Sequence, residues 1–377
     1  MINIKKLILF KSIILIAVFI SLYFTHKGQT NPTVRANDPL IYYIGRIRIE
    51  DTTTIVSWSG TQIIIKFKGT ELKVSLHDEK GENYYQIIID QDSSFIFHPK
   101  QGYQTYRVLK NLKDTIHKVI FFKRTEYIFG RTKFFSFSVN KTGNFLPYSH
   151  PQRLKIEFYG NSITAGLGNE HPTGSSMNSK YENNYLAYGA ISARSLNADY
   201  VCIARSGIGL TISWDSLIMP ELFWRVDPYD STIKWNFKNY QADIVVINLF
   251  QNDSWLVKMP FHAQYKRRFK QKPKDEFFIQ NYYNFVDTLL KLYPYAQIIC
   301  TLGPMSAIAP NSKWKDYILE ATKKLNNSRV HTLFFPYLSK HRHPTIEEHK
   351  KMATILVEYI KMNYKRQKTK RANNGSF

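Results

Sequence analysis

Short runs of β-branched and aromatic residues, separated by turn residues, dominate the chain from Ile41 to Val139. The runs recur roughly every ten residues with Gly, Asp or Asn between them, which is typical of antiparallel strands in a sandwich. We therefore predict a small β-sandwich (jelly-roll) domain over residues 38–145. Its expected strands are TIVSWSG (54–60), TQIIIKFKG (61–69), ELKVSLHD (71–78), NYYQIIIDQ (83–91), HKVIFFKR (117–124) and KFFSFSV (133–139).

The pattern changes after residues 141–152, a segment rich in Gly, Asn, Ser and Pro. Beyond it, apolar strand runs alternate with helical stretches, the order of a parallel sheet with helices on both faces. We predict an α/β domain with a parallel five-stranded sheet over residues 150–364. Its expected strands are LKIEFYG (154–160), ADYVCIA (198–204), ADIVVINLF (242–250), AQIICTLG (296–303) and VHTLFF (330–335), and its expected helices are Tyr185–Leu196, Glu276–Leu292, Trp314–Asn326 and Ile346–Tyr364.

The N-terminal segment, residues 1–30, has the pattern of an export signal. Lys5 and Lys6 precede an apolar stretch whose uninterrupted part, Ile13–Phe24, is 12 residues long. A membrane-spanning helix needs ~20 apolar residues, so this length suits a signal-peptide core better. Because no small-x-small cleavage site follows cleanly, an uncleaved N-terminal membrane anchor is the alternative. Either way we expect an exported protein, periplasmic or secreted.

The net charge of +23 would by itself suggest a nucleic-acid partner. The charge, however, is concentrated in residues 1–37, in residues 258–274 and in a basic tail, residues 365–377, which contain no acidic residue. No nucleic-acid-binding motif accompanies these stretches, so we expect no nucleic-acid partner. The chain contains 2 cysteines, which excludes a disulfide framework and a four-cysteine zinc site.

Candidate catalytic residues follow the expected parallel strands, at the edge where open α/β sheets bind ligands. Ser162 comes after the first strand, Gly207 after the second, Asn252 after the third and His343 after the fifth. A serine hydroxyl needs a base to become a nucleophile, and the resulting oxyanion needs fixed hydrogen-bond donors. Individually these residues have simpler interpretations: a helix cap for Ser162, an Asx turn for Asn252 and Asp253, and an exposed loop for His343.

At these residues the chain resembles the SGNH (GDSL-type) hydrolases, whose GDSIT block appears here as GNSIT (160–164). The resemblance extends to carbohydrate esterase family 2, which joins a β-sandwich to an SGNH domain. It spans most of residues 40–360 and implies a flavodoxin-like SGNH-hydrolase fold. The segments that carry it are IEFYGNSITAGLGNE (156–170), LAYGAISARSLNADY (186–200), HPTIEEHKKMA (343–353), YYIGRI (42–47), VSWSG (56–60), FKGTELKVSL (67–76) and FFKRTEYIFG (121–130).

The resemblance implies a role for each candidate. Ser162 would be the nucleophile and His343 the general base and then acid. The backbone N–H groups of Ser162 and Gly207, with the Asn252 side chain, would form the oxyanion hole. The implied substrates are acetylated polysaccharides such as xylan and glucomannan, and no cofactor is implied. We expect no metal, because the clustered His341, His343 and His349 lack clear metal-ligand spacing.

Three residues depart from the family pattern. Asn161 replaces the Asp before the serine, Phe250 replaces a Gly two residues before Asn252, and His341 replaces an Asp two residues before His343. Because no carboxylate is visible to orient the base, we expect a Ser162–His343 dyad in which the backbone carbonyl of His341 accepts the second ring hydrogen bond.

Three tryptophans are candidate sugar-stacking residues, although each also suits a hydrophobic core. They are Trp214, Trp224 and Trp255. The leading hypothesis is an exported carbohydrate O-deacetylase. The alternatives are an inactive carbohydrate-binding relative and an SGNH esterase acting on lipid or on envelope glycan. The sequence gives no oligomeric state.

Overall fold

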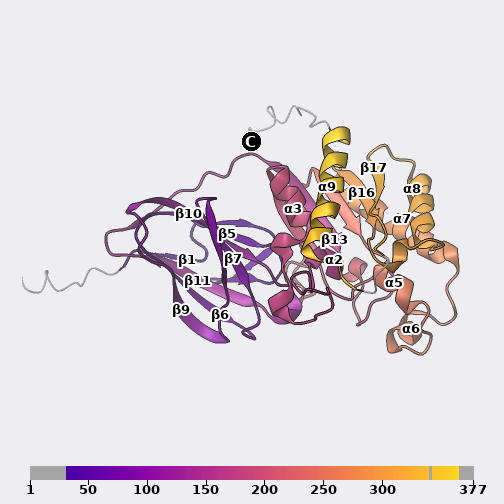
Figure 1. The fold of residues 1–377 in the computed structure, drawn as a ribbon, viewed down its shortest axis with the longest axis horizontal. Coiled ribbons are helices and arrows are strands. Elements are labelled where there is room, and N and C mark those ends of the chain that lie inside the picture. Colours follow the sequence, from indigo (N-terminus) through magenta and orange to yellow (C-terminus); the bar gives the residue numbers. More distant parts are fainter. Residues whose placement is uncertain (1–30, 339–341, 365–377) are drawn as a thin grey trace, which may run out of the picture.

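The computed structural model describes residues 31–338 and 342–364. Figure 1 shows an elongated molecule with a β-sandwich at one end and an α/β unit at the other. Residues 1–30, predicted to be an export signal or anchor, and the basic tail (365–377) lie outside the described residues. No helix of the described part of the chain is long and apolar enough to cross a membrane.

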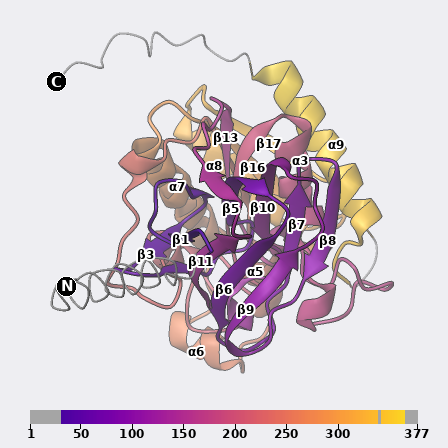
Figure 2. The same ribbon diagram turned by 90° about the vertical axis from the view of Figure 1, so that its left-hand side faces the viewer.

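The N-terminal region is a sandwich of two antiparallel sheets, each with six strands (Figure 2). One sheet has the order β3-β4-β11-β6-β9 with β1 beside β11, and the other has the order β12-β5-β10-β7-β8 with β2 beside β5. Their inner faces enclose a core that includes Phe67, Phe121 and Phe137. The strands are β1 (Thr33–Arg35), β2 (Tyr42–Ile44), β3 (Ile47–Ile49), β4 (Thr54–Val56), β5 (Gln62–Gly69), β6 (Leu72–Asp78), β7 (Tyr85–Ile89), β8 (Ser93–Phe97), β9 (Gly102–Leu109), β10 (Thr115–Lys123), β11 (Thr132–Val139) and β12 (Asn144–Leu146).

The C-terminal region contains a parallel sheet of five strands in the order β14-β13-β15-β16-β17. Numbered along the chain this order is 2-1-3-4-5, the flavodoxin-like arrangement, so the predicted fold class is confirmed. The strands are β13 (Leu154–Gly160), β14 (Ala198–Ala204), β15 (Ile244–Asn248), β16 (Gln297–Leu302) and β17 (Val330–Phe334).

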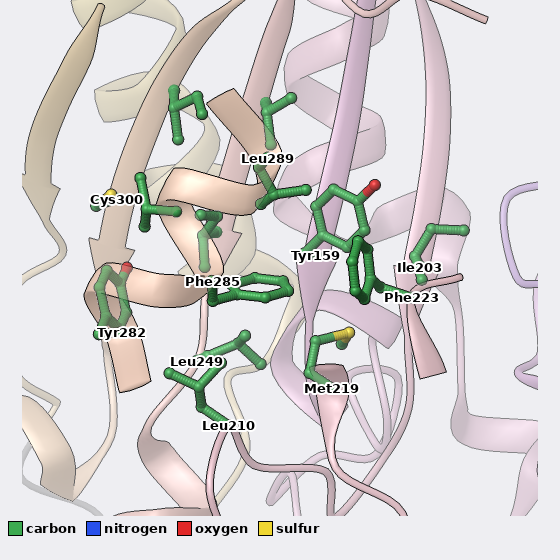
Figure 3. Close-up of a cluster of buried hydrophobic side chains, with 14 of the residues drawn as sticks. Tyr159, Ile203, Leu210, Met219, Phe223, Leu249, Tyr282, Phe285, Leu289 and Cys300 are labelled. Atoms are coloured by element: carbon green, nitrogen blue, oxygen red, sulfur yellow. The ribbon is translucent and has the colours of Figure 1, made fainter. Parts of the chain in front are cut away.

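Helices cover both faces of this sheet. Apolar side chains of α7 and α8 pack on one face, in the cluster that Figure 3 shows around Tyr159 and Phe285. Those of α3 and α9 pack on the other face around Phe158. The α-helices are α2 (Ser162–Ala165), α3 (Tyr188–Ser195), α4 (Met219–Leu222), α5 (Gln251–Leu256), α6 (Ala263–Arg268), α7 (Asp275–Leu292), α8 (Trp314–Leu325) and α9 (Ile346–Asn363), and the 3-10 helices are η1 (Tyr127–Phe129), η2 (Ser179–Tyr181), η3 (Asn184–Leu186), η4 (Phe237–Asn239) and η5 (Ser306–Ile308).

Buried polar contacts fasten the sandwich to the α/β unit. Arg46 forms a fully buried ion pair with Glu157 of β13, at 2.7 Å, and the Trp58 indole donates to the Val226 carbonyl at 2.7 Å. Apolar side chains of both regions share one core cluster. A buried ion pair costs much free energy when one partner is removed, so these contacts hold the two regions in a defined orientation.

Candidate active site

Ser162 lies at the sharp turn between β13 and α2. A Cβ at Gly160 would come within 2.0 Å of the Thr164 hydroxyl, so only glycine fits at the end of the strand. Asn161 caps the helix, because its Oδ1 accepts a hydrogen bond from Ile163 N at 3.0 Å. The turn places Ser162 at the first helical position, where its own N–H has no intrahelical acceptor.

His343 meets this serine from the loop before α9. Its Nε2 lies 2.8 Å from the Ser162 Oγ. Burial lowers the pKa of His343 to about 4, and a hydrogen bond with the Gly174 backbone only partly opposes this shift. The imidazole is therefore neutral near pH 7 and can accept the serine proton. The structure brings together the two residues that were predicted as nucleophile and base.

The loop between α2 and η2 holds the backbone of His343, a contact that no sequence motif indicated. The Gly174 carbonyl accepts a hydrogen bond from His343 N at 3.1 Å, and the Asn169 carbonyl accepts one from Ile346 N at 3.2 Å. Gly174 has a positive φ of 66°, and a Cβ there would lie 2.2 Å from the His343 carbonyl oxygen. The segment that carries His343, called the histidine loop here (residues 342–345), thus packs so closely on position 174 that only glycine fits there.

An ion pair closes the histidine loop onto α9. Arg342 donates to both carboxylate oxygens of Glu348, at 2.5 and 2.7 Å. Partial burial opposes ionisation of Glu348, but hydrogen bonds from Arg342 and Thr345 outweigh it and lower its pKa to about 2. Thr345 and Glu348 form the capping box that begins α9. His341 lies outside the described residues, so its role as acceptor stays a prediction.

The three predicted oxyanion donors follow the carboxyl ends of the neighbouring strands β13, β14 and β15. They are the N–H of Ser162, the N–H of Gly207 and the side chain of Asn252. Gly207 follows β14 with a positive φ of 78°. Asn252, in the first turn of α5, donates from Nδ2 to the Ile208 carbonyl at 2.7 Å and accepts at Oδ1 from the Trp214 indole at 3.1 Å. The amide has a second N–H for an oxyanion.

Asp253 anchors the loop after β14, so the Asx-turn interpretation of this residue is wrong. Its buried carboxylate accepts hydrogen bonds from the backbone N–H groups of Leu210 at 2.9 Å and Thr211 at 2.7 Å. A Cβ at Gly209 would lie 2.5 Å from the same carboxylate. The side chain therefore bonds a distant loop instead of its own turn, and it helps to position Gly207.

The three candidate tryptophans lie in different surroundings. Trp214 is 43% exposed and bonds Asn252. Trp255 lies on α5, half-buried, and donates to Ser306 Oγ at 2.6 Å. Trp224 is partly buried and packs against Phe223 and Phe237 at the edge of the core. The structure therefore groups Trp214 and Trp255, but not Trp224, with elements that carry the site.

Two of the three departures from the family pattern have visible consequences. Asn161 Nδ2 is buried and has no partner among the described residues. Phe250 adopts the left-handed conformation, with φ of 79°, directly before α5. Its buried ring packs against Tyr282 and Trp314, with centroids 5.0 and 4.9 Å away. Packing of the ring compensates for the backbone strain that a glycine would avoid.

The described ranges contain no group of three His, Cys, Asp or Glu side chains that could hold a metal ion. Cys202 and Cys300 are buried and unpaired. Burial raises the pKa of Cys202 to about 11 and that of Cys300 to about 12, so neither is a thiolate near pH 7.

A 2-1-3-4-5 parallel sheet with a serine–histidine pair at its carboxyl edge defines an ester hydrolase of the SGNH class. The family model described as Carbohydrate esterase 2 N-terminal matches residues 43–148. A solved family two carbohydrate esterase from Clostridium thermocellum, in complex with cellohexaose, is 30% identical with a TM-score of 0.76 and is aligned over 85% of this chain and 98% of that chain. The chain belongs to carbohydrate esterase family 2.

Two further relatives carry functional names. The cellulase/esterase CelE of Acetivibrio thermocellus is 32% identical over 89% of this chain, which spans only 41% of CelE. An acetylxylan esterase / glucomannan deacetylase of Cellvibrio japonicus is 25% identical over 87% of this chain and 90% of that protein.

Proposed function

We propose that this protein is an exported serine esterase that removes O-acetyl groups from a polysaccharide or oligosaccharide of the acetylxylan or acetylglucomannan type. The observation that carries the proposal is the 2.8 Å contact between Ser162 Oγ and His343 Nε2, at the same carboxyl edge of the sheet that Gly207 and Asn252 follow. A neutral base, a hydroxyl and fixed donors are the groups that acyl transfer requires.

The reaction uses only these groups and water. His343 takes the hydroxyl proton as Ser162 Oγ attacks the acetyl carbonyl, and the donors stabilise the tetrahedral oxyanion. His343 then protonates the departing sugar oxygen, which leaves an acetyl-serine. A water molecule, deprotonated by His343, attacks this ester, and the proton returns to Ser162 as acetate departs.

The base acts as part of a dyad in this proposal. No Asp or Glu of the described residues lies within ion-pair distance of His343, and the lowered pKa of its imidazole fits a site without a carboxylate partner. The backbone carbonyl of His341 would accept the second ring hydrogen bond and set the tautomer.

A carbohydrate substrate is supported by the relatives and by Trp214. The Cellvibrio japonicus relative is named for xylan and glucomannan, and the Clostridium thermocellum structure contains cellohexaose. Trp214 is 43% exposed beside Asn252, where an aromatic face can stack on a sugar ring. Trp255 is the second proposed contact, whereas the packing of Trp224 gives it no such support.

Acetate release tests the proposal. The purified protein is incubated with acetylated xylan, acetylated glucomannan and acetylated cello-oligosaccharides, and Ser162→Ala is the matched control. Acetate release by the wild type alone is the expected result. Binding of these glycans without release would favour the inactive relative, and cleavage of lysolipids alone would favour a lipid esterase. Export and anchoring are tested separately, by fractionating cells that express the full chain and a chain without residues 1–30.

A further inference from the structure

A residue of the β-sandwich contacts the loop that carries the oxyanion donor. Glu126 lies between β10 and β11, and its Oε2 accepts a hydrogen bond from Ser206 N at 2.7 Å. Ser206 directly precedes Gly207, whose N–H has no acceptor among the described residues and is the proposed oxyanion donor. We propose that Glu126 is a positioning residue that sets the Gly207 N–H for catalysis. The proposal rests on the proposed function.

The Glu126 side chain is buried, and one of its two oxygens, Oε1, has no partner among the described residues. The residue is 0% exposed, and its own backbone N–H donates to Glu182 Oε1 at 2.6 Å. Lys123, also fully buried on β10, donates to the Thr125 carbonyl at 2.7 Å and acts electrostatically on both glutamates. A buried charged group is costly unless it is paired and hydrogen-bonded, so the Ser206 N–H is a substantial part of what satisfies Glu126.

The loop after β14, residues 205–213, is called the oxyanion loop here. Carboxyl groups bind its backbone on both sides of Gly207. On one side, Asp253 holds the backbone N–H groups of Leu210 and Thr211. On the other side, Glu126 holds the N–H of Ser206. The Gly207 peptide lies between these two carboxyl contacts. Glycine populates positive φ, here 78°, about as readily as negative φ, so its own backbone preference does not fix this peptide. Without Glu126, the backbone N–H groups of the loop before Gly207 keep only the longer bond from Arg205 N to the Gly160 carbonyl, at 3.3 Å, so the Gly207 N–H is held less firmly on that side.

A misplaced Gly207 N–H would weaken stabilisation of the transition state. An oxyanion donor strengthens its hydrogen bond as charge develops on the carbonyl oxygen, so a displaced donor lowers kcat more than it raises KM. Loss of a whole donor costs ~10²–10³-fold in kcat. A misoriented donor retains part of that effect, and we expect a loss of roughly tenfold or more.

Two substitutions at Glu126 separate positioning from a general electrostatic role. Glu126→Gln removes the charge but keeps an oxygen that can reach Ser206 N, and it should retain most of the kcat. Glu126→Asp keeps the charge near Lys123 but is one methylene shorter, and it should lose kcat at nearly constant KM. A residue needed only to neutralise Lys123 would show the reverse order, which would overturn the proposal.

The matched control is Asp227→Asn. Asp227 is a buried carboxylate that also links the two regions, through Ser57 at 3.2 Å and Arg131 at 3.3 Å, but it makes no contact with the oxyanion loop among the described residues. This variant should melt at a lower temperature than the wild type with kcat unchanged. An equal loss of kcat in Asp227→Asn and Glu126→Asp would show that any weakening of the interface lowers turnover, and would refute a specific role of Glu126.

Hydrogen exchange provides a readout that does not need esterase activity. The amides of residues 205–209 should exchange faster in Glu126→Asp than in the wild type and in Asp227→Asn. If the wild type releases no acetate but this difference is present, the proposed function fails while the positioning contact stands. Unchanged exchange together with wild-type kcat in a folded Glu126→Asp protein would overturn the inference.

Discussion

The indole Nε1 of Trp214 donates a hydrogen bond to Oδ1 of Asn252, at 3.1 Å. This bond decides which way the Asn252 amide faces, because it fixes the oxygen on the side of the indole. The Nδ2 then donates to the Ile208 carbonyl at 2.7 Å and has one N–H left for the proposed oxyanion. Trp214 thus combines an exposed aromatic face with control of a catalytic donor.

Trp214→Phe separates these two roles. Phenylalanine keeps an aromatic face but has no N–H, so the Asn252 amide loses its orientation. We expect kcat to fall by ~10-fold while KM for an acetylated oligosaccharide changes little. Steady-state kinetics on that substrate and on 4-nitrophenyl acetate measure the effect. A higher KM for the sugar with unchanged kcat would mean that Trp214 only binds substrate.

Asn252→Ala removes the amide donor itself. Because the donor acts mainly on the transition state, we expect kcat to fall by ~10²-fold or more with little change in substrate affinity. A binding assay on the same variant checks affinity independently. If KM rises and kcat is unchanged, Asn252 is a ground-state substrate contact.

Ser162→Ala should fold normally and lose esterase turnover, because the nucleophile is absent. Among the histidines, His343→Ala should lose nearly all activity, whereas His341→Ala should keep most of it, since only the backbone carbonyl of His341 is proposed to act. Acetate release and circular dichroism of each variant provide the test. If His341→Ala is inactive and His343→Ala is active, His341 is the general base instead. If substitution of a distant Asp abolishes activity as completely as His343→Ala, the enzyme uses a full triad.

The pH profile follows from the lowered pKa of His343. A histidine accepts a proton only when neutral, so activity is present above the pKa and is lost as the pH falls through it. The pKa of about 4, caused mainly by burial, places the acid limb of kcat/KM near that pH instead of near the unperturbed ~6.5. Initial rates across the acid range, with circular dichroism to confirm folding, measure the limb. An acid limb of kcat/KM near pH ~6.5 would show that His343 is not buried from water as the structure indicates.

Phe250→Gly tests the balance between backbone strain and packing. Glycine would relieve a left-handed conformation that costs roughly 1–2 kcal/mol. Removal of the buried ring costs roughly 3–5 kcal/mol. The loss of packing is the larger effect, and we expect the free energy of unfolding to fall by about 2 kcal/mol, measured by denaturant titration. A variant more stable than the wild type would show that strain dominates at this position.

The sequence by itself determined the main elements of the α/β unit. β13 and β14 begin and end where the pattern predicts, at Leu154–Gly160 and Ala198–Ala204, because strands buried on both faces are continuous apolar runs. The capping box at Thr345 likewise marks the start of α9. By contrast, two longer strands of the sandwich were missed. β8 (Ser93–Phe97) is exposed at four of its five positions, and β9 (Gly102–Leu109) is fully buried only at Leu109. The short β1, β2, β3 and β12 were missed as well.

Only the tertiary structure decided how the site is held. Ser162 and His343 are 181 residues apart in the sequence, and Glu126 meets Ser206 across 80 residues. The candidate serine and histidine were recognisable because their chemistry is specific to a short motif. Gly174, Asp253 and Glu126 act through backbone contacts with distant loops, and such contacts leave no local pattern of residue types. They arise only when the parallel sheet and the sandwich bring separate loops to one edge.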